Sequence, residues 1–195
     1  MAVLDFVQRF NWLDIFVVIL FFRIGYVAVK TGIFIEFFKL LGILFSCYLS
    51  LQNYTKLADF ARSRIPASSV LSLELWDFLA LLVLAALGYL VFVLLREAFF
   101  RFVKTETVSV LNKWGALLLG IARGFILCSL IIFLMSVPVL DYLENSVKKS
   151  FSGKRLIKVS TGVYTYLWNN LATKFIPQQK FNKVVLEVQK DILEK

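Results

Sequence analysis

The sequence contains no histidine and only two cysteines, Cys47 and Cys128, each within an apolar run. It therefore offers no imidazole base or ligand, no CxxC pair and no cysteine–histidine metal cluster. A nucleophile elbow, a phosphate-binding loop and a dinucleotide fingerprint are absent from it as well. We interpret the two thiols as small packing or lipid-facing residues. The sequence accordingly indicates a protein that is not an enzyme and that uses no cofactor or metal.

Charged residues are also scarce over four long apolar stretches, near residues 12–30, 33–51, 76–95 and 114–140. The 195-residue chain is 59% hydrophobic and has a mean hydropathy of +0.78, which is more apolar material than one small soluble core can bury. Each stretch is long enough to cross a hydrocarbon layer of ~30 Å, because a helix rises ~1.5 Å per residue. The sequence therefore predicts an all-α membrane protein with about four transmembrane helices.

The two ends of the chain differ in composition. We expect residues 1–140 to form a four-span membrane domain and residues 141–195 to form a basic, amphipathic C-terminal tail. Further amphipathic helices at the membrane surface are expected over 1–11, just before Pro66 and over 96–113. The alternative for the tail is a partly disordered, solvated segment. The first apolar run has acidic residues beside it and no small-residue cleavage site after it, so we interpret it as an uncleaved helix.

Basic residues outnumber acidic ones and give a net charge of +9, with most of the excess near the C-terminus beside apolar segments. This placement favours contact with the bilayer and its anionic lipid headgroups over binding to nucleic acid. Basic residues also differ in number between the two sides of the predicted bundle. The side of both termini has Arg9, Lys56, Arg62, Arg64, Lys148, Lys149, Lys154, Arg155 and Lys158, and the other side has Lys30, Arg96, Arg101, Lys104 and Lys113. The positive-inside rule therefore favours cytoplasmic termini.

The fourth stretch has small residues four positions apart, Ala116, Gly120 and Gly124, which share one narrow helix face. Such a face lets a second helix approach closely, so we interpret it as a packing seam. Its partner is either another span of the same chain or a second copy, which makes a homo-oligomer one of the expected assemblies, beside contacts with other membrane proteins. Gly42 and Ser46 begin a second face of small residues on the second span.

Five charged residues fall within the stretches or near their ends, namely Asp14, Arg23, Glu36, Lys39 and Arg123. Glu36 and Lys39 are three residues apart, so they share a helix face and can pair. An arginine at the middle of a bilayer costs about 2.5–3.5 kcal/mol on insertion scales, so Arg123 needs a partner or a task. The set indicates either an ion or proton pathway, or structural charge pairs and side chains that reach to the membrane surface.

Short motifs along the chain resemble the colicin V production protein (CvpA) family. They are Asn11-Trp12-Leu13-Asp14 at the start of the first span, Gly32 with Glu36 four residues later, Gly42, and the stretch 112–124. The resemblance covers roughly residues 11–140. It implies a small bacterial inner-membrane protein with four spans, linked to production or export of a peptide toxin and to upkeep of the cell envelope. It implies no established reaction.

The chain departs from the family pattern at the entrance to the last span. Asn112-Lys113 stands where an acidic residue and an arginine are common, Ala116 stands where glycine is usual, and Ile35 replaces a basic residue. The matching positions are Gly120, Arg123 and Gly124. Asn112 is expected to cap the last helix. Because position 112 is not acidic, the sequence leaves open which group pairs with Arg123.

Two functions from different classes remain at this point. The first is a non-enzymatic membrane protein that acts through membrane partners in toxin production, export and envelope homeostasis. The alternative is a subunit of a small ion or solute transporter or channel that uses the charges within the spans. A third hypothesis is a recruiter at the membrane surface that acts through the basic tail.

Overall fold

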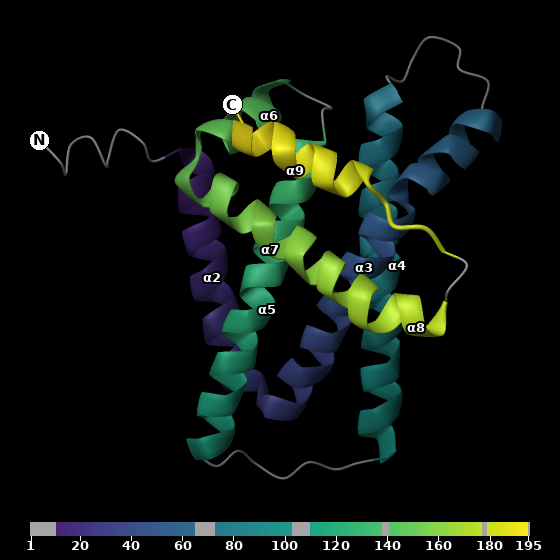
Figure 1. Ribbon diagram of the computed structural model, residues 1–195. Helices are drawn as coiled ribbons and strands as arrows, with labels where there is room; N and C mark the ends of the chain where they lie inside the picture. The colour runs from purple at the N-terminus through teal and green to yellow at the C-terminus, as the bar shows by residue number, and fades with distance from the viewer. Residues whose placement is uncertain (1–10, 65–72, 103–109, 138–140, 177–178, 195) are drawn as a thin grey trace, which may run out of the picture.

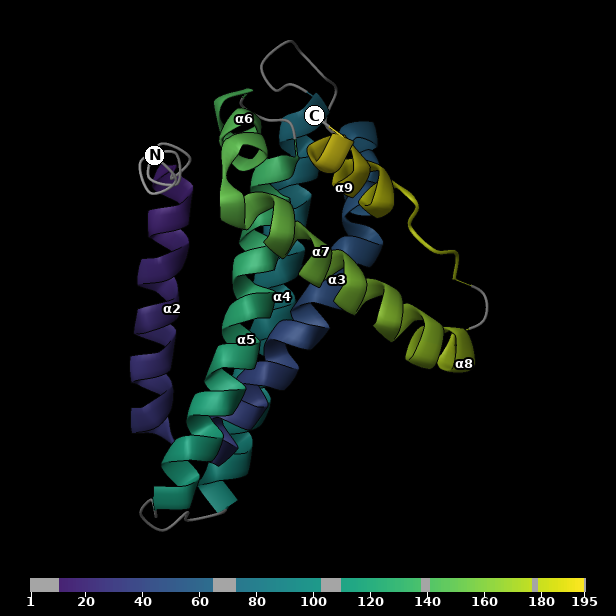
Figure 2. The same ribbon diagram turned by 60° about the vertical axis from the view of Figure 1, so that its left-hand side comes forward.

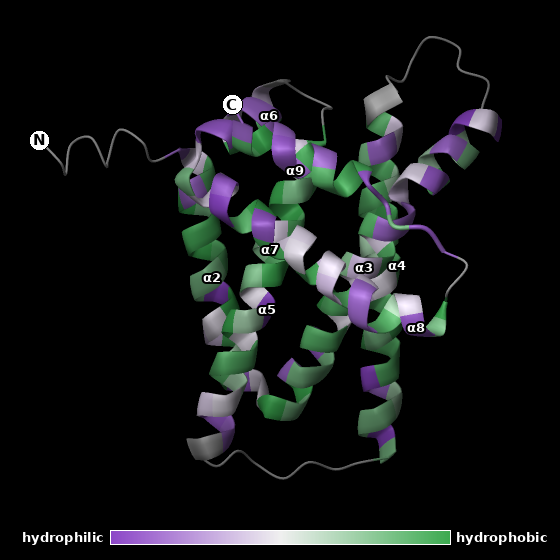
Figure 3. Cartoon of the chain, viewed as in Figure 1, coloured by the Kyte–Doolittle hydropathy of each residue, from purple (hydrophilic) through white to green (hydrophobic). Residues whose placement is uncertain are grey.

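The computed structural model describes residues 11–64, 73–102, 110–137, 141–176 and 179–194, and within those ranges it contains helices and no strand (Figure 1). Four helices are long and apolar enough to cross a membrane: α2 (Trp12–Thr31), α3 (Ile33–Arg64), α4 (Leu73–Phe102) and α5 (Val110–Ser136). They stand side by side as a bundle, with their hydrophobic residues along the shafts (Figures 1 and 3). The predicted all-α membrane fold with four spans is confirmed.

Helix pairs in the bundle are held by close approach. α3 packs along α4, and α2 packs along α5, which also contacts α3. Between α3 and α4, a Cβ added at Gly88 would lie only 2.8 Å from the Cα of Ser46, and the Ser46 hydroxyl donates to the Ala85 carbonyl at 2.6 Å. The second face of small residues, predicted on the second span, is therefore a contact between α3 and α4.

Two of the span helices, α3 and α4, are longer than the apolar stretches that predicted them. α3 continues for 32 residues, where the sequence predicted a span followed by a separate surface helix before Pro66. The continuation is stabilised by packing, since Tyr54 is 2% exposed and meets the ring of Phe133 edge-on, with centroids 6.3 Å apart. α4 likewise continues to Phe102, into the segment expected as an interfacial helix.

Several expectations fall on residues outside the described ranges. They are the amphipathic lead over 1–10, the middle of the expected interfacial helix at 103–109, and the last residues of the fourth stretch at 138–140.

The C-terminal part is helical and lies against the bundle. It consists of α6 (Asp141–Lys149), α7 (Phe151–Leu167), a π-helical turn η1 (Trp168–Ala172), α8 (Thr173–Phe175) and α9 (Val184–Glu194). α7 crosses α5 and α3 obliquely, as Figures 1 and 2 both show. Ile157 and Tyr164 on its inner face are fully buried. The segment expected as a tail thus contributes to the core of the described structure.

Candidate functional site

Side chains of three helices meet at the buried carboxylate of Glu36, in the first turn of α3: Thr31 from α2, Lys39 from α3 itself and Arg123 from α5. Glu36 is 0% exposed. Its Oε1 accepts hydrogen bonds from the Thr31 hydroxyl at 2.7 Å and from the Lys39 ammonium at 2.6 Å. Its Oε2 lies 3.0 Å from a terminal guanidinium nitrogen of Arg123 in α5. We call these four residues, Thr31, Glu36, Lys39 and Arg123, the Glu36 centre.

A single glycine brings the carboxylate to this position. Gly32 is the one residue between α2 and α3, and its φ of 85° lies in the left-handed region that favours glycine. The chain reverses there, so α3 starts beside the end of α2, and Glu36 lies one turn inside α3, where its backbone N–H donates to the Gly32 carbonyl at 3.1 Å. The amino end of α3 adds a positive partial charge that favours a carboxylate at this place.

Asn112 caps a different helix from the one that the sequence suggested. α5 starts at Val110, two residues before Asn112, so Asn112 is not its N-cap. The Asn112 side-chain oxygen instead accepts a hydrogen bond of 2.6 Å from the backbone N–H of Ile33, the first residue of α3. The prediction that Asn112 caps the last helix is wrong, because the side chain of Asn112 binds the start of α3 instead. Asn112 thereby ties the entrance of α5 to the helix that carries Glu36.

The seam predicted at Ala116, Gly120 and Gly124 packs against α2 of the same chain. A Cβ added at Gly120 would overlap the Cβ of Ala28 and lie 3.7 Å from Glu36 Oε2. Gly124 faces the ring of Phe21, which a Cβ there would meet at 3.1 Å, and Ala116 is fully buried. The seam lets α5 approach closely enough for Arg123 to reach Glu36.

The Glu36 centre holds one carboxylate between two cations with little access to solvent. The side chains of Lys39 and Arg123 are only 11% and 12% exposed. Within the described residues, Glu36 Oε2 and Arg123 Nε make no hydrogen bond, so the two side chains form a single ion pair rather than a bidentate fork. Loss of one member of such a group leaves buried charge uncompensated, which costs about 3–5 kcal/mol in known cases. The centre can therefore brace α2, α3 and α5 together.

Asp14 lies elsewhere, at the other end of α2, and joins two helix starts. It is the third residue of α2 and forms a capping box with Asn11, whose backbone N–H donates to Oδ2 at 3.0 Å. The same carboxylate accepts from the backbone N–H of Ser152 at 2.8 Å and from the Ser152 hydroxyl, in the first turn of α7. Asn11 and Trp12 also donate to Ser146 of α6, at 3.0 and 3.2 Å. We call Asn11, Trp12, Asp14, Ser146 and Ser152 the Asp14 clamp.

The other predicted site residues have separate places. Gly42 lies in the contact of α3 with α4, where a Cβ would meet the Cβ of Phe92 at 3.0 Å. Arg23 is exposed and lies outside the Glu36 centre. The sequence did not single out Thr31, Ser146 or Ser152, since serine and threonine carry no pattern by themselves. For Ser152, a sequence signal exists in Ser150, the N-cap of α7, whose hydroxyl accepts from Gly153 N at 2.7 Å.

The fold and these contacts define a multi-pass helical membrane protein braced by a buried charge centre. A family model described as colicin V production protein matches residues 13–161, and the chain belongs to that family. The match extends beyond the four spans and includes the Asp14–Ser152 contact and α7 as far as residue 161. Neither the curated proteins nor the solved structures yielded a match to this chain.

Proposed function

We propose that this protein acts without catalysis in the production or export of a colicin V type peptide toxin and in homeostasis of the cell envelope. It acts through contacts with other membrane proteins and with the bilayer. Family membership supports the process, and the Glu36 centre supports the mode of action. Both oxygens of Glu36 are engaged, by Thr31 and Lys39 on one side and by Arg123 on the other. A carboxylate held in this way serves as a brace between helices.

The proposed location is the bacterial inner membrane, with both termini in the cytoplasm. Support comes from basic residues at one end of the bundle, where Arg62 and Arg64 end α3 and Lys148 and Lys149 end α6. Anionic headgroups of the cytoplasmic leaflet would contact this end. A fluorescent protein that folds only in the cytoplasm, fused after residue 195, tests the orientation. Fluorescence is expected, and a dark but membrane-inserted fusion would reverse the assignment.

The role is tested by complementing a strain that lacks its own copy of the gene and carries a colicin V producing plasmid. The wild-type chain should restore secreted toxin activity and resistance to envelope stress. Arg123→Ala should restore neither, because it opens the brace, whereas the control Arg96→Ala should restore both, because Arg96 makes only a loose contact of 3.9 Å with its neighbour Glu97. Full complementation by Arg123→Ala at equal protein level would show that the function does not require the Arg123–Glu36 ion pair.

Flux measurements distinguish this proposal from the transporter or channel alternative. Purified protein in liposomes is expected to carry no ion flux above that of empty liposomes. An ion flux that depends on the charge of the ion and is lost in Arg123→Ala would support a transporter or channel subunit instead. The same purified material, taken from mild detergent, tests for membrane partners, since the proposal expects other membrane proteins to copurify with the wild-type chain and not with Arg123→Ala.

A further inference from the structure

The stretch from α7 through η1 to α8 lies at the depth of the membrane spans. We call it the arm (residues 151–175). Its inner side borders an apolar pocket of about 410 Å³ against α3 and α4. The residues of α3 and α4 that line this pocket are Leu41, Leu44, Phe45, Tyr48 and Phe92. Leu41 is eight residues inside α3, or about 12 Å along the helix axis from Ile33. α8 accordingly lies well below the end of the bundle that carries α6 and α9 (Figures 1 and 2).

Hydrogen bonds fix the arm at this depth. The Ser129 hydroxyl of α5 accepts from the backbone N–H of Ser160 at 2.6 Å and donates to the Leu156 carbonyl. The Tyr164 hydroxyl donates to Gln52 of α3 and accepts from the backbone N–H of Asn182 at 2.9 Å. These contacts use buried polar atoms of both partners, so the arm is part of the packed structure rather than a helix resting on a surface.

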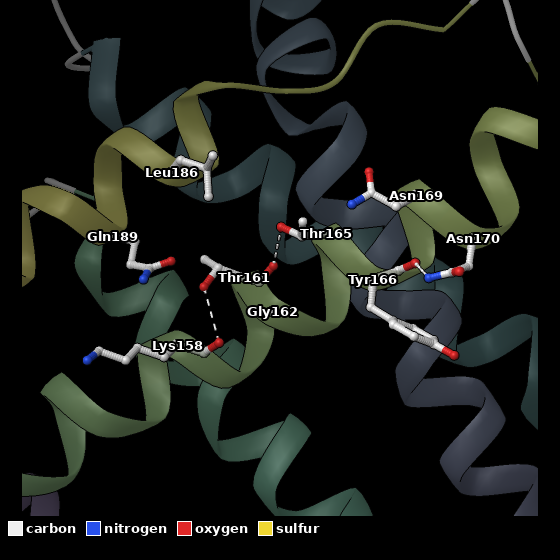
Figure 4. A pocket seen from close by; sticks show the side chains of 9 residues that line it. All are labelled: Lys158, Thr161, Gly162, Thr165, Tyr166, Asn169, Asn170, Leu186 and Gln189. Atoms are coloured by element: carbon white, nitrogen blue, oxygen red, sulfur yellow. Dashed lines mark hydrogen bonds between the residues drawn. The ribbon is translucent and has the colours of Figure 1, made fainter.

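The side of the arm that faces α9 carries mostly polar residues. Figure 4 shows the side chains that line a groove there, most of which end in a hydroxyl, amide or ammonium group. The volume of the groove is about 400 Å³. Thr161 and Thr165 donate to carbonyls of their own helix, at 3.1 and 2.8 Å. Among the described residues, the Lys158 ammonium, the Tyr166 hydroxyl and the Asn169 side-chain amide have no hydrogen-bond partner, and Tyr166 and Asn169 are exposed. Hydrocarbon chains offer such groups no partner, so this face needs water or a polar protein surface over it.

The charges of α7 and α9 fit a second copy of the same chain. α7 carries Lys154, Arg155 and Lys158 and no acidic residue, and α9 carries three acidic residues and one lysine. The three acids are Glu187, Asp191 and Glu194, and all three are exposed. The α7 of one copy can therefore face the α9 of the next, and contacts of this head-to-tail kind form rings where the rotation between copies closes.

We propose that copies of this chain assemble through this face, basic α7 against acidic α9, and that their arms together enclose a water-filled cavity that reaches into the membrane. The lining of the cavity is cationic at Lys158 and amide-rich at Asn169 and Asn170. It is open to water at the end of the bundle that carries α6 and α9. The assembly does not depend on the proposed role in toxin production.

Cysteine accessibility tests the water-filled cavity. Asn169→Cys and, as a matched control, Leu90→Cys are made in the full chain, whose own cysteines Cys47 and Cys128 are buried. Leu90 is 49% exposed and lies two residues from Phe92, which borders the arm. In membranes, a membrane-impermeant thiol reagent should label Asn169→Cys and leave Leu90→Cys at the level of the unaltered chain. An anionic reagent should react faster than a cationic one of the same size. Protection of Asn169→Cys to the level of Leu90→Cys would overturn the cavity, and faster reaction of the cationic reagent would overturn its cationic lining.

Charge reversal tests the assembly. The wild-type chain should be an oligomer by mass in mild detergent, and Lys154→Glu with Arg155→Glu should reduce it to monomer. Adding Glu187→Lys and Asp191→Lys to that variant should restore the oligomer, which a misfolded protein would not do. A wild-type chain that is monomeric, or an oligomer that is unchanged by the reversal of α7, would show that second copies do not cover this face.

Discussion

Arg123 of α5 and Glu36 of α3 form an ion pair of 3.0 Å across the bundle, and Lys39 holds the other oxygen of the same carboxylate at 2.6 Å. This contact answers the question raised by Asn112, because the acid that pairs with Arg123 comes from another helix and not from the entrance of α5. The pairing depends on Gly120 of α5, where an added Cβ would overlap the Cβ of Ala28 in α2.

The stability losses from replacing Glu36 and Arg123 should not be additive. Glu36→Gln should lower the free energy of unfolding in detergent by about 3–5 kcal/mol, because Arg123 and Lys39 lose the carboxylate that they share. Arg123→Met should cost less, because Lys39 still pairs with Glu36. The double variant should lose less than the sum of the two single losses, with a coupling of about 1–3 kcal/mol. Thermal unfolding of the four proteins measures the coupling. Additive losses would show that the two side chains do not interact.

The seam predicts opposite results for two glycines that look alike in the sequence. Gly120→Ala should lower stability by about 1–3 kcal/mol, because the new methyl group overlaps Ala28. Gly25→Ala is the matched control, since its Cβ would lie 3.6 Å from Leu117, an ordinary contact. Alanine is the better helix former by about 0.5–1 kcal/mol, so this control should be neutral or stabilising. Equal effects of both variants on the melting temperature would contradict the close approach at Gly120.

Asn112 should act on the start of α3. Asn112→Ala removes the acceptor for Ile33 N–H and should cost about 0.5–2 kcal/mol, as the loss of other N-caps does. Asn112→Asp keeps an oxygen at the same place and should retain most of the stability. Amide hydrogen exchange locates the effect: faster exchange is expected in the first turn of α3, with the first turn of α5 unchanged. Faster exchange confined to α5 would mean that Asn112 caps the last helix, as the sequence suggested.

Local patterns in the sequence were sufficient for the features that involve neighbours on one helix. The apolar runs gave the four spans, and the three-residue spacing gave the Glu36–Lys39 pair, which the structure contains. The faces of Gly120 and Gly42 were identified as packing seams from their small residues. These inferences rest on the period of the helix, which is the same in every helical protein.

Contacts between distant residues were not predictable from those patterns. Nothing near Asn112 indicates that its side chain meets Ile33, and nothing near Asp14 indicates Ser152. α7 has a mixed composition, so its hydropathy suggested the membrane surface, although its inner face with Ile157 packs into the bundle. One-dimensional patterns carry no information on which faces meet, because tertiary packing decides it.

The Asp14 clamp should control the docking of α7. Asp14→Ala removes a cap from the starts of both α2 and α7, each worth about 0.5–2 kcal/mol. Limited proteolysis should then cut residues 141–195 faster than in the wild-type chain, while α2 to α5 stay protected. Asp59→Ala is the control, because that carboxylate has a 73% exposed side chain and a surface pair with Arg62. Unchanged cleavage in Asp14→Ala would mean that α7 is held without the clamp.

Tyr164 should make the docking of α7 sensitive to alkali. Burial raises the pKa of its hydroxyl from 10.0 to about 12. The hydrogen bond from the backbone of Asn182 lowers this pKa, and the nearby Tyr48 raises it further. A group whose pKa is higher in the folded state stabilises the protein below its unfolded pKa, near 10, and this contribution is lost as the pH rises through about 12. Tyr164→Phe should cost about 1–3 kcal/mol at neutral pH, because Gln52 and Asn182 lose their partner, and should flatten the fall in stability between pH 10 and 12. Denaturation at stepped alkaline pH measures both effects, and parallel curves for the two proteins over that range would exclude Tyr164 as the responsible group.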